Sequence, residues 1–254
     1  MTAAAGDLLG ASGGSRVGRV LEAELGRVRA ARPGLRPLVL DVGGGSGAWA
    51  VPLAAAGCTV TVVDSSPNAL AALQRRAREA GVGQHVTAVQ GDVDALTDCV
   101  ESGSADLVLG HGLLEVVDDA RGAVTALTAA AAPGAAVSVL VTGRTAAVLS
   151  RVLAGRLAEA RAVLTDPDGR LGPGDKLRRR LDGPGLRELL AGAGLEVEIV
   201  QGDGVLDAWL PGAVRDGNAP GAGAAEIAEL ESLAAGVPAL REVAARLHAL
   251  ARRP

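Results

Sequence analysis

The stretch Val39-Leu-Asp-Val-Gly-Gly-Gly-Ser-Gly47 decides the fold, because it joins a short apolar strand to a glycine-rich turn. An Ala-rich segment follows the turn and is predicted to run as a helix to about Gly57. Glycine in such a turn lets a ligand approach the backbone closely, and the free N–H groups of the next helix point toward that ligand. Gly43, Gly45 and Gly47 are therefore predicted to bind a ligand.

Outward from this turn, predicted strands alternate with predicted helices. Alternation at this spacing is typical of parallel βαβ units, and it predicts a doubly wound α/β fold with a mostly parallel sheet. The predicted strands span residues 37–41, 58–64, 85–90, 105–110, 136–142, 195–200 and 246–252. The predicted helices span 17–31, 48–57, 67–80, 119–131, 146–165 and 184–193.

The alternation is interrupted between residues 146 and 183. A helix over 146–165 is followed by a segment rich in Pro and Gly, so we expect 146–183 to be a helical insertion that covers the sheet as a lid. Residues 1–14 are rich in Ala, Gly and Ser and are expected to be flexible. The 254 residues are otherwise expected to form a single domain.

Acidic residues follow the first three predicted strands. Gly43-x-Gly45-x-x-Ala48 also fits the dinucleotide pattern GxGxx(G/A), so the turn alone leaves NAD open. Asp41, directly before the turn, would repel a pyrophosphate but attract an ammonium group, which favours S-adenosylmethionine. Asp64, with Ser65 beside it, ends the second strand, where an acid can accept hydrogen bonds from ribose hydroxyls.

Asp92 and Val93 follow the third predicted strand. Asp92 is predicted to accept a hydrogen bond from an adenine amino group, with Val93 against the ring. The alternative role for Asp92 is a cap for the segment that starts at Val93. Together with the glycine turn, these residues form the predicted cofactor site.

On these residues, the stretch 37–142 resembles the class I S-adenosylmethionine-dependent methyltransferases. The resemblance implies methyl transfer and a Rossmann-like seven-stranded sheet whose antiparallel last strand would be residues 246–252. It also implies cofactor contacts at Asp41, Gly43, Gly45, Asp64 and Asp92.

The segment from Asp106 to Val117 has a closer resemblance, to the bacterial tRNA carboxymethoxyuridine methyltransferases. Those enzymes carry His and Glu at the places of His111 and Glu115, and a basic run where this chain has Lys176-Leu-Arg-Arg-Arg180. The resemblance implies that a tRNA carboxylate accepts the methyl group. The chain departs from those enzymes in its aromatic residues, of which Trp209 alone remains in the late region.

His111 and Arg144 are the predicted catalytic residues. They follow the fourth and fifth strands, and ligands of open α/β sheets bind at the carboxyl ends of the strands. A carboxylate acceptor needs no general base, but it needs a cation such as arginine to hold it. The alternative roles are a loop hydrogen bond for His111 and a solvated helix start for Arg144, whereas His248 is expected to be structural.

The composition favours a small or medium anionic acceptor over tRNA. The net charge is −4 and the chain has no Phe or Tyr, so both phosphate contacts and base stacking would be scarce. A tRNA carboxyl methyltransferase and a non-catalytic scaffold that binds S-adenosylmethionine stay open as alternatives. We expect no DNA partner.

The same composition predicts where the protein acts and what it lacks. Cys58 and Cys99 lack metal-ligand spacing, which predicts no metal site. No apolar run is long enough to span a membrane, and the first residues lack the pattern of a signal peptide. A cytoplasmic protein without a membrane partner is therefore expected.

Overall fold

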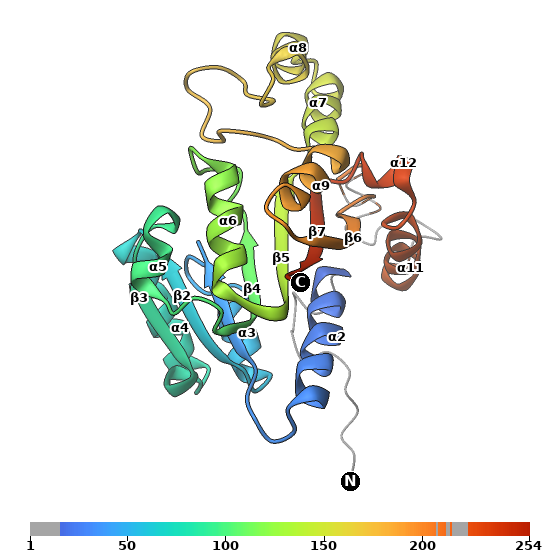
Figure 1. Cartoon of the computed structure of the whole chain (residues 1–254). Helices are drawn as coiled ribbons and strands as arrows, with labels where there is room; N and C mark the ends of the chain where they lie inside the picture. Colours follow the sequence, from blue (N-terminus) through green and yellow to red (C-terminus); the bar gives the residue numbers. More distant parts are fainter. Residues whose placement is uncertain (1–15, 207, 212–213, 215–222) are drawn as a thin grey trace.

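The computed structural model describes residues 16–206, 208–211, 214 and 223–254 (Figure 1). The segment 1–14, which was expected to be flexible, lies outside these residues. In the described part, seven strands form one sheet in the order β3-β2-β1-β4-β5-β7-β6. The strands are β1 (Leu38–Val42), β2 (Thr59–Asp64), β3 (Val86–Gln90), β4 (Ala105–His111), β5 (Ala131–Thr142), β6 (Glu196–Asp203) and β7 (Arg246–Arg252).

The strand directions confirm the predicted fold class. The pairs β1–β2, β2–β3, β1–β4 and β4–β5 are parallel. The last strand, β7, inserts between β5 and β6 and runs antiparallel to both, as the resemblance to methyltransferases implied. This arrangement places the first residue of β7, Arg246, opposite Thr142 at the carboxyl end of β5.

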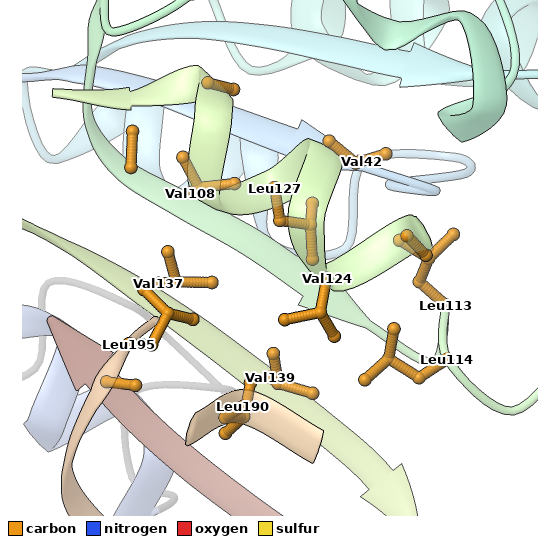
Figure 2. Close-up of a cluster of buried hydrophobic side chains, with 14 of the residues drawn as sticks. Val42, Val108, Leu113, Leu114, Val124, Leu127, Val137, Val139, Leu190 and Leu195 are labelled. Atoms are coloured by element: carbon orange, nitrogen blue, oxygen red, sulfur yellow. The ribbon is translucent and has the colours of Figure 1, made fainter. Parts of the chain in front are cut away.

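Helices cover both faces of the sheet. Leucines and valines of α2 (Arg16–Ala31), α3 (Ala50–Ala55) and α4 (Pro67–Glu79) pack on one face. The other face is covered by α5 (Leu96–Cys99), α6 (Ala120–Ala130) and α9 (Gly183–Ala191). Figure 2 shows this second layer, where Val124 and Leu127 of α6 and Leu190 of α9 lie over Val137 and Val139 of β5. The remaining elements are the 3-10 turns η1 (Gly83–His85) and η2 (Val93–Ala95), and the helices α11 (Ala224–Ala234) and α12 (Pro238–Arg241).

The helices of the insertion differ from their prediction. The helix predicted over 146–165 is two helices, α7 (Arg144–Leu153) and α8 (Leu157–Thr165), which stand beyond the end of the sheet (Figure 1). Gly155 separates them with a φ of 71°, a left-handed conformation that ends a helix. The apolar spacing continues through Gly155, which is why the pattern alone predicted a single helix.

Strand β5 is also longer than predicted. It begins at Ala131 and passes through Pro133 and Gly134, whereas the sequence pattern predicted a helix up to residue 131 and a strand only from residue 136. Gly134 has a positive φ of 75° and donates its N–H to the carbonyl of Arg253. The C-terminus of the chain thus pairs with the start of β5.

Candidate functional site

The glycine turn after β1 has the backbone conformation that its sequence predicts. Gly43, Gly45 and Gly47 have φ values of 72°, 56° and 81°, a region that residues with a side chain rarely adopt. A β-carbon added to Gly47 would lie 2.3 Å from the Cδ1 of Leu73 on α4. The turn therefore needs glycine both for its conformation and for its close packing against α4.

Asp64, at the end of β2, is bonded to this turn. One oxygen of its carboxylate accepts the N–H of Gly45 at 2.9 Å, and the other accepts the N–H of Ser66 at 2.8 Å. Each carboxylate oxygen can accept a second hydrogen bond, so the side chain retains capacity for the hydroxyl groups of a ligand. Asp64 and Ser65 both line the cavity described next.

A cavity of about 330 Å³ opens beside the turn, at the carboxyl ends of β1, β2 and β4. Four aspartates line it and no Arg, Lys or His does, so its walls suit a neutral or cationic ligand and would repel a pyrophosphate. We call it the cofactor cavity. Its lining residues are Val42, Gly43, Val63, Asp64, Ser65, Gly91, Asp92, Val93, Asp94, Gly112, Leu113, Val116, Val117 and Asp118.

Asp92 fits both of the roles weighed for it. Asp92 lines the cofactor cavity, and its carboxylate accepts the N–H of Asp94 at 3.3 Å, so it caps the 3-10 turn η2. Val93 is buried in the wall of the same cavity. A ligand could therefore contact the carboxylate of Asp92 and the apolar surface of Val93 together.

Asp41 is buried under the glycine turn. Its Oδ2 atom has no hydrogen-bond partner among the described residues. Burial, together with the charge of Asp64, raises the pKa of Asp41 to about 7. An unpartnered acidic oxygen at this place fits the ammonium group of an amino-acid ligand.

Gly44, which the sequence analysis did not select, explains how Asp41 is enclosed. A β-carbon at Gly44 would lie 2.4 Å from Oδ2 of Asp41 and 2.9 Å from Val62. The φ of Gly44 is not positive, so the constraint is the space above Asp41. The run of three glycines, in place of the alternating pattern, was the signal that could have identified it.

A second cavity, of about 290 Å³, shares Gly43 and Gly112 with the cofactor cavity. We call it the acceptor cavity. It is lined by Asp41, Gly43, Gly44, Ala48, Trp49, His111, Gly112, Glu115, Leu140, Val141 and Arg246. Because the two cavities meet at Gly43 and Gly112, a group bound in one lies next to a group bound in the other.

His111 lines the acceptor cavity, at the end of β4. Its Nε2 lies 2.8 Å from the hydroxyl of Ser138, and its ring meets that of Trp49 edge to face with centroids 5.0 Å apart. Burial, assisted by the nearby His248 and Arg246, holds the pKa of His111 well below its ordinary value. The ring is therefore neutral at pH 7.

Arg144 does not join His111. Its guanidinium donates hydrogen bonds to the carbonyls of Leu164, Asp166 and Pro167, and Arg144 is not among the residues that line the two cavities. It fastens the first turn of α7 to the end of α8. Arg144 follows β5 as predicted, but the carbonyls of the insertion engage its side chain, a contact that no local sequence pattern indicates.

Arg246 is the arginine that lines the acceptor cavity. It is half exposed, and its Nη2 lies 2.6 Å from a carboxylate oxygen of Asp203. Arg246 was not among the predicted site residues, because it follows β5 by about a hundred residues and only the antiparallel pairing of β7 brings it to the carboxyl end of β5. Its position at the start of the predicted last strand was the available signal.

The basic run is bonded within the protein. Arg178 pairs with Asp118 at 3.1 Å, and Arg179 donates to the carbonyls of Leu114, Val117 and Asp118. Arg180 and Asp175 form an ion pair at 2.6 Å, and both side chains are buried. The run therefore holds the return segment of the insertion against the loop that follows β4.

Glu115 fastens the same loop. Its carboxylate accepts the N–H of Thr142 at the end of β5, and its carbonyl accepts the N–H of Arg178 at 2.7 Å. Glu115 also lines the acceptor cavity. The loop between β4 and α6, which forms a wall of both cavities, is thus bonded to β5 and to the insertion.

Comparison with protein families gives a match over the segment from β1 to the start of β5. Residues 39–134 match the family model described as a methyltransferase domain. The protein is accordingly a methyltransferase. S-adenosylmethionine is the cofactor of this methyltransferase, and the acidic cofactor cavity and the unpartnered oxygen of Asp41 fit its adenosine and its ammonium group.

Solved structures share the fold of the methyltransferase. An S-adenosylmethionine-dependent methyltransferase from Mesorhizobium loti is 18% identical with a TM-score of 0.58, and the alignment covers 97% of this chain and all of that one. The magnesium protoporphyrin IX methyltransferase ChlM from Synechocystis PCC 6803 is 16% identical with a TM-score of 0.57, and the alignment covers 93% and 83% of the two chains.

The [4+2]-cyclase SpnF also shares the fold, at 21% identity and a TM-score of 0.56, with 92% and 82% of the two chains covered. A search of curated proteins by sequence gives no match. None of the described helices of the methyltransferase is long and apolar enough to cross a membrane. Identities this low show the fold and leave the acceptor to be argued from the site.

Proposed function

We propose that the methyltransferase transfers the methyl group of S-adenosylmethionine to a small or medium anionic acceptor, with carboxylates as the leading class. The observation that carries this proposal is the acceptor cavity, which adjoins the cofactor cavity at Gly43 and Gly112 and has the guanidinium of Arg246 in its wall. About 290 Å³ is enough for a compact metabolite and is at the low end for ligand sites.

The cofactor-binding roles in this proposal follow the sequence analysis. Asp64, with Ser65, would contact the ribose hydroxyls, and Asp92 the adenine amino group with Val93 against the ring. Asp41 lines the acceptor cavity and not the cofactor cavity, so the ammonium end of the cofactor would reach into the acceptor cavity beside Gly43 to face it. Support comes from the lining of the cofactor cavity, from the spare acceptor capacity of Asp64 and from the unpartnered oxygen of Asp41.

The residues of the acceptor cavity would position the acceptor and exclude water. When bound, S-adenosylmethionine supplies an electrophilic methyl group, and a carboxylate attacks it without losing a proton. Catalysis is then chiefly alignment. One nitrogen of the Arg246 guanidinium pairs with Asp203, and the guanidinium has further N–H groups that could donate to a carboxylate. His111 is neutral, and the ring of Trp49 beside it keeps that wall apolar.

The tRNA alternative rests on the resemblance of Asp106–Val117 to the carboxymethoxyuridine enzymes. The structure weakens the support that the basic run gave to it, because Arg178, Arg179 and Arg180 are all bonded to groups of the protein itself. A wobble base would also need an aromatic platform. Trp209 does not line the acceptor cavity, and its indole N–H is donated to the carbonyl of Val243. Trp49 is the tryptophan that lines the acceptor cavity.

Methyl transfer to fractionated extract tests the proposal. The purified protein is incubated with S-adenosylmethionine labelled in its methyl group and with either the small-metabolite fraction or the tRNA fraction of cells that express it. We expect label in the metabolite fraction, released as methanol by mild alkali because a methyl ester is hydrolysed there. Arg246→Gln should reduce the label, whereas the matched control Arg178→Ala should not.

Three outcomes would contradict the proposal. Label in tRNA would establish the alternative acceptor. Alkali-stable label in a metabolite would exclude a carboxylate. Binding of S-adenosylmethionine with no label in either fraction would favour the non-catalytic scaffold that the sequence analysis left open.

A further inference from the structure

A row of hydrogen-bonded polar side chains crosses the sheet from the acceptor cavity. It joins one residue from each of four strands to the first residue of α2, and we call it the polar row. The distances are 2.8 Å between His111 Nε2 and Ser138 Oγ, and 2.9 Å between Ser138 Oγ and His248 Nε2. They are 3.0 Å between His248 Nδ1 and Gln201 Nε2, and 2.6 Å between Gln201 Oε1 and Arg16 Nε.

The polar row is enclosed by the protein. The side chains of Ser138, His248 and Gln201 are buried between the sheet and α2, where the surrounding residues are leucines and valines. Buried polar groups at these sites lose free energy unless every donor meets an acceptor. His248 was predicted to be structural, and the sequence alone indicates no role for Ser138 or Gln201.

Arg16 sets the direction of the polar row. An arginine guanidinium only donates hydrogen bonds, so Gln201 must present its carbonyl oxygen to Arg16. The amide NH₂ of Gln201 then faces His248 and donates to its Nδ1. Turning the amide over would place two donors against each other at Arg16 and is therefore excluded.

The direction of the hydrogen bonds continues from His248 through Ser138 to His111. Burial lowers the pKa of His248 to about 3, so the ring is neutral and carries one proton. Because Nδ1 accepts from Gln201, that proton is on Nε2 and is donated to the hydroxyl of Ser138. Ser138 has one hydrogen, and Nε2 of His111 is the one acceptor left within hydrogen-bond distance of its hydroxyl among the described residues, so the hydroxyl donates there.

We infer that the polar row fixes His111 in the tautomer with its proton on Nδ1, so that His111 serves the acceptor cavity as a hydrogen-bond donor and not as a base. Ser138, His248, Gln201 and Arg16 are then positioning residues. The tautomer follows from the row itself, whereas the donor role rests on the proposed function.

An observation at the other end of the ring supports the donor role. Nδ1 of His111 is buried and has no partner among the described residues, although the ring lines the acceptor cavity. A buried N–H without an acceptor is costly, so a ligand oxygen at this place would be favoured. An anionic acceptor supplies such an oxygen.

Nitrogen NMR of the whole protein labelled with ¹⁵N-histidine tests the tautomer directly. The chain has three histidines, and His85→Gln removes the signal of the histidine outside the polar row. Two-bond correlations between ring protons and nitrogens distinguish the two tautomers. We expect the proton on Nδ1 in His111 and on Nε2 in His248.

Two variants test whether the row transmits its direction. Gln201→Leu removes the donor to His248 without touching His111, and we expect His111 to become a mixture of both tautomers. Ser138→Ala should do the same and lower methyl transfer about fivefold or more with cofactor affinity unchanged, whereas Ser138→Thr keeps the hydroxyl and should restore both. A residue that acts only through packing would leave the tautomer of His111 unchanged.

A proton on Nε2 of His111 in the unmodified protein would overturn the inference, as would a tautomer that Gln201→Leu leaves unaltered. The unmodified protein and Gln201→Leu keep the test decisive if Ser138→Ala fails to fold. A correct tautomer in a protein that labels neither fraction would contradict the proposed function and leave the tautomer assignment standing.

Discussion

The cofactor cavity and the acceptor cavity are neighbours, but they are built in different ways. The cofactor cavity is formed by the carboxyl ends of β1 and β2 and by the turns and loops after β1, β2, β3 and β4, so each of its residues lies at the end of a strand or in the segment that directly follows one. The acceptor cavity adds Arg246 from β7, and its His111 depends on side chains from β5, β6 and α2. The first site is specified by local sequence, and the second by long-range pairing.

This difference explains what could be predicted from the sequence. Gly43, Gly45, Gly47, Asp64 and Asp92 were selected because a strand, a turn and a helix constrain one another locally, and they lie where that pattern indicates. The sheet and its antiparallel last strand followed from the same alternation and from the resemblance.

The acceptor side could be predicted only in part. His111 lines the acceptor cavity, whereas the predicted cation, Arg144, does not line it, because its side chain is bonded to the carbonyls at the end of α8. No local pattern reports that contact or the pairing of Thr142 with Arg246. Ser138 and Gln201 stand out only once their strands are known to be buried and adjacent.

The largest effect is expected at the glycine turn of the cofactor side. Gly44→Ala places a β-carbon 2.4 Å from Asp41, so we expect unfolding to become easier by about 1–3 kcal/mol and the Kd for S-adenosylhomocysteine to rise about 100-fold. Gly45→Ala is the matched control, since its β-carbon meets only Asp64, at 3.9 Å, and the cost is about 1–2 kcal/mol of backbone strain. An equal rise in the Kd for S-adenosylhomocysteine in the two variants would show that the space above Asp41 is not the constraint.

Asp64→Ala should weaken cofactor binding about 10- to 100-fold, because hydrogen bonds to a charged acceptor contribute about 1.5–3 kcal/mol. The variant also loses the acceptors for the N–H groups of Gly45 and Ser66, so a small loss of stability is expected in parallel. Asp64→Asn keeps one acceptor oxygen, so its Kd for the cofactor should lie between that of the unmodified protein and that of Asp64→Ala. Calorimetry with S-adenosylhomocysteine measures each Kd, and an unchanged value in folded Asp64→Ala would exclude the ribose contact.

Asp41 should make cofactor binding depend on pH. Its pKa in the folded protein, about 7, lies above the ordinary value of 3.8 for an aspartate, so the stability of the ligand-free protein should fall as the pH rises toward 7 and level off above it. An ammonium group needs the ionised carboxylate, so affinity should be about tenfold higher at pH 8 than at pH 6. Asp41→Asn should abolish this dependence, and a pH profile that the variant retains would assign the titration to another group.

Arg246 and Arg144 test the acceptor side. Arg246→Gln should lower methyl transfer about fivefold with the Kd of the cofactor unchanged, since a hydrogen bond to a charged group is lost. Arg144→Ala removes the bonds to the carbonyls of Leu164, Asp166 and Pro167, so it should lower the melting temperature more than the turnover. Label transfer measures the turnover of both variants, and thermal denaturation measures their melting temperatures. A larger loss of turnover in Arg144→Ala than in Arg246→Gln would favour the predicted catalytic role of Arg144.

Calorimetric titration of the unmodified protein with S-adenosylmethionine, S-adenosylhomocysteine and NAD tests the account most directly. The four aspartates of the cofactor cavity and the enclosed carboxyl of Asp41 predict micromolar binding of the first two ligands and no measurable binding of NAD, whose pyrophosphate these carboxylates repel. Binding of NAD without binding of S-adenosylmethionine would contradict it.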